Sequence, residues 1–127
     1  MDNHAQWKKI LPKAVYEVCW LKGTEPPFSG KYNKHFAKGI YHCICCNQIL
    51  FKSEQKYDSG SGWPSFWQAI NDNAIKKQKD LRHGLNRLEL LCSRCNAHLG
   101  HLFTDGPEPT NLRYCINSIA LSFKEEQ

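Results

Sequence analysis

The sequence lacks the long apolar segments that would place it in a membrane or on a secretory route. No run reaches the ~18 consecutive apolar residues that a transmembrane helix requires. Residues 1–13 alternate polar, charged and aromatic side chains, so they contain neither the apolar core of a signal peptide nor an Arg-rich transit segment. We therefore expect no membrane partner and a cytoplasmic location, or an organelle with a similarly reducing interior.

Internal repeats and low-complexity tracts are also missing, and the composition is that of a globular protein. Hydrophobic residues make up 41% of the 127 residues and charged residues 23%. A chain of this length buries one modest core, which favours a single domain over residues 1–127. Within it, residues 1–22 are predicted to form an N-terminal extension and helix, and we expect a monomer.

A concentrated basic face is missing too. The formal net charge is +5, but the lysines scatter along the chain apart from a cluster within residues 76–79. Nucleic-acid-binding proteins usually gather their basic residues in one stripe or patch. We interpret the cluster as a solvated face or an edge strand, with phosphate binding as the weaker alternative, and expect no nucleic-acid partner.

The N-terminal part of the chain has the apolar period of a helix. Its apolar face would consist of residues at helical spacing, namely Leu11, Ala14, Val15, Val18 and Cys19. Pro12 suits the first turn of such a helix, and Gly23 suits the position just after its end. A loop at residues 24–30, which contains Pro26 and Pro27, should follow.

From residue 39 onward the patterns favour strands. The candidate segments are residues 39–45, 48–52, 74–79, 87–91, 98–103 and 112–123. A glycine-rich turn at residues 58–62 precedes Trp63 and Pro64. The predicted fold class is therefore mainly β, with antiparallel sheets and a short N-terminal helix.

Seven cysteines, an odd number, argue against a secreted disulfide framework and favour metal ligation or thiol chemistry. Four of them form two C-x-x-C pairs at strand ends, Cys43 with Cys46 and Cys92 with Cys95. Four thiolates suit one structural Zn²⁺ per chain, a closed site with no position open for water or substrate. The alternatives are one redox-active dithiol, which the doubled motif disfavours, or four unrelated core cysteines. Cys45 could compete as a ligand, but it is too close to Cys43 for the usual turn.

Cys115 is the candidate for thiol chemistry. In a strand, alternate residues share a face, so Arg113, Cys115 and Asn117 point one way and their neighbours the other. A nearby arginine stabilises a thiolate and lowers its pKa. The alternative is an inert, half-buried strand cysteine, the usual role of a free cysteine.

The longer motifs resemble those of the B-type methionine sulfoxide reductases, a family that acts on the R epimer of methionine sulfoxide. The resemblance covers nearly everything from residue 23 to residue 123. It rests on both C-x-x-C pairs and on the segments GTEPPFSG at 23–30, DSGSGWPSF at 58–66, HLGHLFTDGP at 98–107 and RYCINS at 113–118.

This resemblance implies a catalytic role for five residues. Cys115 would be the nucleophile whose thiolate attacks the sulfoxide sulfur and is left as a sulfenic acid. His101 would be the general acid and His98 a second active-site histidine. In a straight strand these two would face opposite ways, unless Gly100 permits a bulge. Asn117 would hold substrate oxygen or water, and Arg113 would support the site.

The resemblance also implies substrate contacts. Trp63 would pack against the methyl group of the substrate, Phe103 would line the pocket, and Asp105 would support it. The alternatives are purely structural roles: core packing for Trp63, and a turn position before Gly106 for Asp105.

One position departs from the family. Many members carry a recycling cysteine where this chain has Ser61, so the commonest internal disulfide is absent. Cys19 is the first alternative as resolving cysteine, although it falls on the apolar helix face, and Cys45 is the second. The third is direct reduction by an external thiol.

The predicted function is reduction of methionine R-sulfoxide in oxidised proteins, with re-reduction by thioredoxin or another thiol. The rival from another class is a zinc-ribbon binding module for protein or RNA, favoured by the zinc site and the positive charge. A second rival is a reductase of other sulfoxides or of free methionine sulfoxide.

Overall fold

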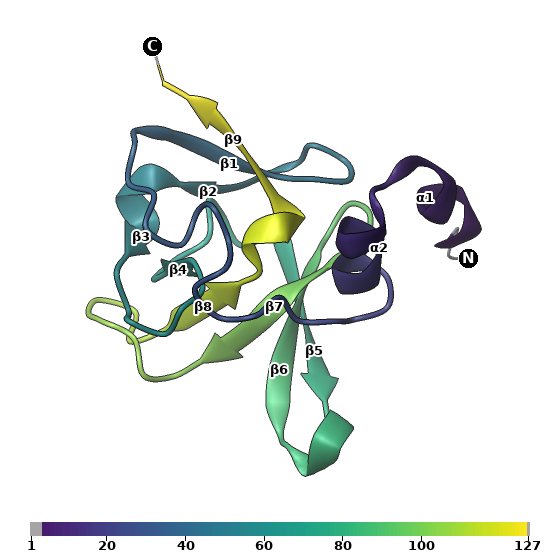
Figure 1. The fold of residues 1–127 in the computed structure, drawn as a ribbon. Coiled ribbons are helices and arrows are strands. Elements are labelled where there is room, and N and C mark those ends of the chain that lie inside the picture. The colour runs from purple at the N-terminus through teal and green to yellow at the C-terminus, as the bar shows by residue number, and fades with distance from the viewer. Residues whose placement is uncertain (1–3, 127) are drawn as a thin grey trace.

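The computed structural model describes residues 4–126; residues 1–3 and 127, which the predicted domain includes, lie outside the described residues. The strands form two antiparallel sheets (Figure 1). A three-stranded sheet has the order β2 (Ile49–Lys52), β1 (Gly39–Cys43), β9 (Leu121–Glu125). A six-stranded sheet has the order β3 (Lys56–Tyr57), β4 (Ser65–Phe66), β8 (Arg113–Ile116), β7 (His98–Phe103), β6 (Arg87–Cys92), β5 (Ile75–Asp80). The predicted mainly β, antiparallel class is confirmed.

Aromatic side chains from both sheets form the centre of the core. Phe51 of β2 stacks on Phe66 of β4, with ring centroids 3.9 Å apart, and both rings are fully buried. Tyr41 of β1 meets Phe66 edge-on at 5.2 Å, and Tyr114 of β8 meets Phe51 at 5.8 Å. Aromatic pairs stabilise a fold by more than the burial of their surface alone. These pairs therefore stabilise the packing of the two sheets into one core.

Two short helices, α1 (His4–Ile10) and α2 (Lys13–Cys19), precede the sheets, where one helix was predicted. Pro12 lies at the N-cap of α2, immediately before its first turn. Trp7 of α1 stacks on Trp20, just after α2, with centroids 5.6 Å apart. This stacking packs α1 against the residue that follows α2. The apolar period of residues 11–19 predicts only α2, so it could not predict α1 or this contact.

The predicted strand at residues 112–123 is wrong as one element. The structure divides it into β8 and β9, which belong to different sheets, with the 3₁₀ helix Ser118–Ala120 between them. The backbone N–H groups of Ser118 and Ile119 donate to the carboxylate of Glu25 at 2.9 Å each. These N–H groups therefore bind a side chain from the N-terminal loop and not a neighbouring strand.

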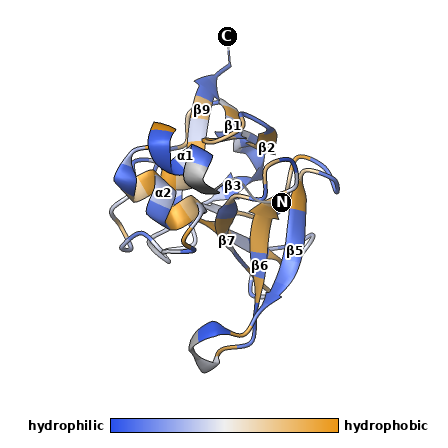
Figure 2. Ribbon diagram, turned by 90° about the vertical axis from the view of Figure 1, so that its right-hand side faces the viewer, coloured by the Kyte–Doolittle hydropathy of each residue, from blue (hydrophilic) through white to orange (hydrophobic). Residues whose placement is uncertain are grey.

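The lysine cluster lies on β5, the edge strand of the six-stranded sheet, as predicted. In Figure 2 this strand is largely hydrophilic, whereas most of the neighbouring β6 is hydrophobic. Exposed lysines on an edge oppose pairing with another chain. Among residues 4–126, no helix is long and apolar enough to cross a membrane.

Candidate active site and metal centre

The two C-x-x-C pairs meet in space. Their four sulfur atoms all lie within 4.8 Å of one another, with Cys43 Sγ 3.7 Å from Cys95 Sγ and Cys46 Sγ 3.5 Å from Cys92 Sγ. Tetrahedral bonds of about 2.3 Å to one zinc ion would separate sulfurs by roughly 3.8 Å. The four predicted ligands therefore form a donor set that fits a single metal ion.

Both pairs sit in turns of the same construction. Asn47 donates its N–H to the Cys43 carbonyl at 2.9 Å, and Asn96 donates to the Cys92 carbonyl at 2.8 Å. Each asparagine has a positive φ, 68° and 71° respectively, a conformation that asparagine tolerates better than most residues. Gln48 connects the two turns, since its amide nitrogen donates to Ser93 Oγ at 2.9 Å. Each turn thus directs its two thiols to the same point.

Cys115 lies in a separate cavity of about 210 Å³. Six of the predicted site residues line this cavity: Trp63, His101, Phe103, Arg113, Cys115 and Asn117. Ser61, Thr24 and Arg87 also contribute to its wall. The structure therefore brings together residues from the N-terminal loop, the glycine-rich turn and strands β6, β7 and β8.

Opposing effects act on the pKa of the Cys115 thiol. Burial raises its pKa, while the charge of Arg113 and hydrogen bonds from Ser61 and Arg113 lower it. The net shift is upward, because burial is the largest cause. The expected effect of Arg113 is present, but burial outweighs it. The free thiol is consequently protonated at neutral pH.

A bulge in β7 places the side chains of His98 and His101 on the same side of the sheet. Leu90 of β6 pairs with Gly100, but Leu91 pairs with His98, so β7 contains an extra residue at this point. The rings of His98 and His101 lie 5.4 Å apart. A Cβ at Gly100 would collide with the carbonyl oxygen of Cys115, so only glycine allows β7 and β8 to approach this closely.

His101 is paired with a buried carboxylate. Its Nε2 lies 2.7 Å from Asp80 Oδ2, and Arg82 donates to Asp80 at 2.9 and 2.7 Å. The two guanidinium bonds are the main reason that the pKa of Asp80 is far below its usual range. Because Asp80 stays ionised, the proton between them belongs to His101 Nε2, which leaves Nδ1 for a group in the cavity.

His98 lies behind His101 and does not line the cavity. Its Nδ1 is 2.7 Å from Glu89 Oε2, and Lys22 donates to Glu89 Oε1 at 3.1 Å. Both His98 and Glu89 are 1% exposed. The sequence interpretation missed Asp80 and Glu89, which belong to no motif; their only signal is that acidic residues lie in β5 and β6.

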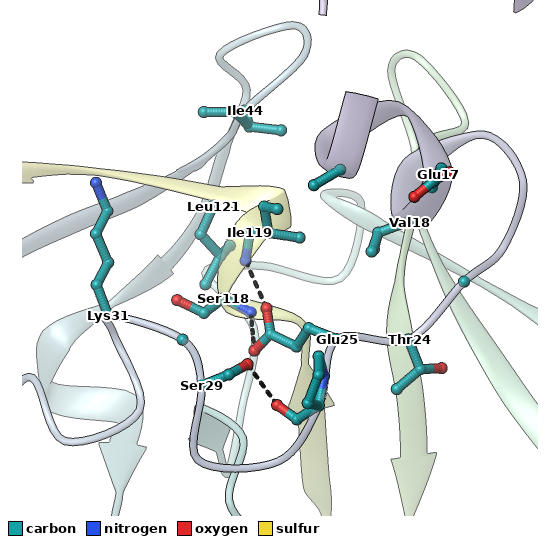
Figure 3. A pocket seen from close by; sticks show the side chains of 14 residues that line it. Glu17, Val18, Thr24, Glu25, Ser29, Lys31, Ile44, Ser118, Ile119 and Leu121 are labelled. Atoms are coloured by element: carbon teal, nitrogen blue, oxygen red, sulfur yellow. Dashed lines mark hydrogen bonds between the residues drawn. The ribbon is translucent and has the colours of Figure 1, made fainter. Parts of the chain in front are cut away.

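Glu25 anchors the N-terminal loop to the site. Figure 3 shows its carboxylate reaching Ser118 and Ile119, beside a cavity of about 440 Å³. Its backbone N–H donates to Asn117 Oδ1 at 3.0 Å, and its carbonyl accepts from Trp63 Nε1 at 3.0 Å. Glu25 thus orients two predicted site residues, and the sequence interpretation assigned it no role.

Asp105 lies outside the cavity and supports one of its walls. It accepts from Arg113 Nε at 2.9 Å, and the guanidinium of Arg113 lies 4.4 Å from the centre of the Phe103 ring. Asn117 Nδ2 donates to the Leu99 carbonyl at 3.1 Å, which fixes the direction of its amide.

The two candidate resolving cysteines lie together, away from Cys115. A hydrogen bond with Cys19 is the largest of the effects that raise the pKa of Cys45. Cys19 is 1% exposed, and neither residue lines the cavity of Cys115. Their resolving role stays a prediction.

Comparison with known proteins agrees with the motifs. The SelR domain family matches residues 11–125. A peptide methionine sulfoxide reductase MsrB of Pseudomonas savastanoi pv. phaseolicola is 55% identical over 122 residues, which cover 96% of this chain and 93% of that protein. The MsrB of Thioalkalivibrio sulfidiphilus is 57% identical over 117 residues, 92% of this chain and 85% of that protein.

A solved structure, the Mis18 "Yippee-like" domain, is similar in fold with a TM-score of 0.54. It is 20% identical and covers 71% of this chain and 98% of that domain. At this identity the similarity concerns the fold alone. The family match and the close relatives, in contrast, extend over the site, and the chain belongs to the SelR-domain family of B-type peptide methionine sulfoxide reductases.

Proposed function

We propose that Cys115 is the nucleophile with which this chain carries out its family's reaction, the reduction of methionine R-sulfoxide in proteins. The observation that supports it is the cavity in which the Cys115 thiol lies beside His101, Trp63 and Asn117. A zinc-ribbon binding module would need no buried thiol in such a cavity.

In the first step the Cys115 thiol loses its proton to water, and the resulting thiolate attacks the sulfoxide sulfur. His101 takes up a proton from solvent at Nδ1 while its Nε2–H stays paired with Asp80, and it donates the Nδ1 proton to the sulfoxide oxygen as the bond from that oxygen to sulfur breaks. The oxygen passes to Cys115, so the products are a thioether and a cysteine sulfenic acid. Overall, one thiol and one sulfoxide become one sulfenic acid and one methionine.

The other residues that line the cavity bind and orient the substrate. The Trp63 indole, held through Nε1 by the Glu25 carbonyl, forms the wall for the substrate methyl group. Asn117 binds the sulfoxide oxygen, or a water beside it, because its amide is fixed by Glu25 and Leu99. His98 acts through His101, against which its ring packs.

Two external thiols restore the enzyme: the first forms a mixed disulfide with Cys115 and releases water, and the second frees Cys115. Thioredoxin or another dithiol would supply them. The cavity supports this direct route, since neither Cys19 nor Cys45 lines it. All seven cysteines are free, which suits a reducing compartment such as the cytoplasm.

The four-cysteine site is proposed to hold one structural Zn²⁺. When bound, the ion supplies the charge that allows four neighbouring thiols to be thiolates at once. The ion would be held by Cys43 at the end of β1 and Cys46 in the turn after it, and by Cys92 at the end of β6 and Cys95 in the turn after it. It would thereby join the two sheets.

The test is an assay of the separated sulfoxide epimers, in peptide form, with dithiothreitol. We expect turnover of the R epimer by the wild type and none by Cys115→Ser. The matched control is Cys45→Ser, which should retain turnover. Turnover by Cys115→Ser, or none of the R epimer by the wild type, would contradict the proposal.

A further inference from the structure

Phe28 is an exposed aromatic residue that folding does not explain. Its side chain is 64% exposed, so little of the ring is removed from water. Its φ is +64°, a conformation that residues with a bulky side chain rarely adopt. Asparagine or glycine would meet the backbone requirement at lower cost. Non-glycine residues in this region cluster at ligand-binding sites.

The Phe28 ring lies beside the turn that forms part of the site. Phe28 donates its N–H to the Gly62 carbonyl at 2.7 Å. Its ring packs so closely on Gly62 that a Cβ there would lie 3.0 Å from two ring carbons. Gly62 stands between Ser61 and Trp63, both of which line the cavity of Cys115. Phe28 thus lies on the outer side of the turn that forms one cavity wall.

The Cys115 cavity is large enough for one side chain but too small for a segment of polypeptide. Its volume is about 210 Å³, below the ~300–1,000 Å³ of pockets that enclose drug-sized ligands. The backbone of a protein substrate must therefore run across the rim, and its flanking residues must contact the surface outside the cavity. Exposed aromatic side chains are the usual anchors for such contacts.

We propose that Phe28 is a docking residue for the oxidised polypeptide, and that it binds an apolar side chain close in sequence to the methionine sulfoxide. This inference rests on the proposed function and assigns a residue outside the cavity to the binding of its protein substrate. Lys31 and Lys34 border a hollow of about 360 Å³ next to Phe28. Their charge favours an acidic residue over a basic one farther along the bound segment.

The test compares a minimal substrate with peptides. The substrates are N-acetyl-methionine R-sulfoxide and two peptides that carry the R-sulfoxide with leucine or glycine on either side. Phe28→Asn removes the ring and keeps a residue that tolerates positive φ, and Phe28→Tyr keeps the ring. Phe36→Ala is the matched control, because Phe36 is also exposed but packs on Lys56 outside the cavity.

We expect Phe28→Asn to raise KM for the leucine peptide about tenfold, the effect of losing part of a phenylalanine contact, with kcat unchanged. KM for the minimal substrate should stay the same, and Phe28→Tyr and Phe36→Ala should match the wild type. An equal change for the minimal substrate, or no change for the leucine peptide, would overturn the proposal.

Direct binding separates this inference from the chemistry. Titration of the leucine peptide into Cys115→Ser protein, followed by tryptophan fluorescence, should show affinity about tenfold weaker when Phe28→Asn is added. Equal affinities would refute docking at Phe28. Loss of turnover in all variants with the binding difference intact would instead contradict the proposed reaction.

Discussion

His101 Nε2 lies 2.7 Å from Asp80 Oδ2, although β6 separates β5 from β7 in the sheet. Asp80 is the last residue of β5, and Arg82 turns back to bind it with two hydrogen bonds. Arg87 reaches the same carboxylate at 3.7 Å. The proposed general acid is therefore held by a carboxylate that is itself fixed and ionised.

Asp80→Asn should weaken the acid. The pKa of His101 is lowered chiefly by burial, while Asp80 opposes this shift and Arg87 and His98 add to it. Without the carboxylate the pKa falls further, so imidazolium persists only at lower pH. We expect kcat/KM at pH 7 to fall about 10–100-fold, less than the ~10²–10⁴-fold of a whole general acid because His101 itself remains, and its alkaline limb to move to lower pH. Asp72→Asn, an exposed control, should leave the pH profile unchanged; an unchanged profile in Asp80→Asn would refute the role.

Arg113→Met should make Cys115 less reactive. The pKa of this thiol is already raised by burial, and Arg113 opposes the shift. The thiolate is the reactive form and predominates only above the pKa, so alkylation by iodoacetamide should quicken as pH rises, and the variant should need a higher pH for the same rate. Below the pKa, each unit of further increase slows the reaction about tenfold. The measurement is labelling of Cys115 by mass spectrometry, with Lys124→Met as control. Equal or faster labelling in Arg113→Met would contradict the account.

Ser61→Cys should create an internal recycling route. Ser61 lines the same cavity as Cys115, so a thiol introduced at this position shares that cavity with the sulfenic acid. After one turnover without reductant, the introduced thiol and Cys115 should form a disulfide with release of water, and two free thiols should disappear. Ser59→Cys is the matched control in the same turn and should lose only one. The same loss in both variants would show that the position is not special.

Cys19→Ala and Cys45→Ser should keep full turnover with either dithiothreitol or thioredoxin. The physical reason is that neither thiol lines the Cys115 cavity, in which the sulfenic acid forms. Steady-state rates with each reductant are the measurement. If Cys19→Ala turned over with dithiothreitol but stalled after one cycle with thioredoxin, Cys19 would be the resolving cysteine after all.

Metal analysis should find one zinc per chain, lost in Cys92→Ser but retained in Cys45→Ser. Structural zinc sites contribute about 10–16 kcal/mol, comparable to the whole folding stability of a domain. Loss of the metal should therefore unfold the protein at ambient temperature, which circular dichroism would detect. A folded, zinc-free Cys92→Ser protein would show that the metal is not structural.

Local patterns in the sequence predicted the parts of the site that depend on residues close to one another in the chain. The C-x-x-C spacing identified the four sulfurs that meet, since a tight turn aims both thiols of a pair. The strand period placed Arg113, Cys115 and Asn117 on one face, and all three line one cavity. The two-residue strands β3 and β4 were missed because they are too short to show alternation.

What the sequence by itself determined, then, is the set of four sulfurs that meet, the face of Cys115 and the mainly β class. Only the tertiary structure decided which carboxylates hold the histidines, and that Glu25 ends β8 by binding the N–H groups of Ser118 and Ile119. It also decided the balance at Cys115, where burial outweighs Arg113. The reason is physical: periodicity and turn chemistry act between near neighbours, whereas pairing, burial and desolvation depend on residues that only the fold brings together.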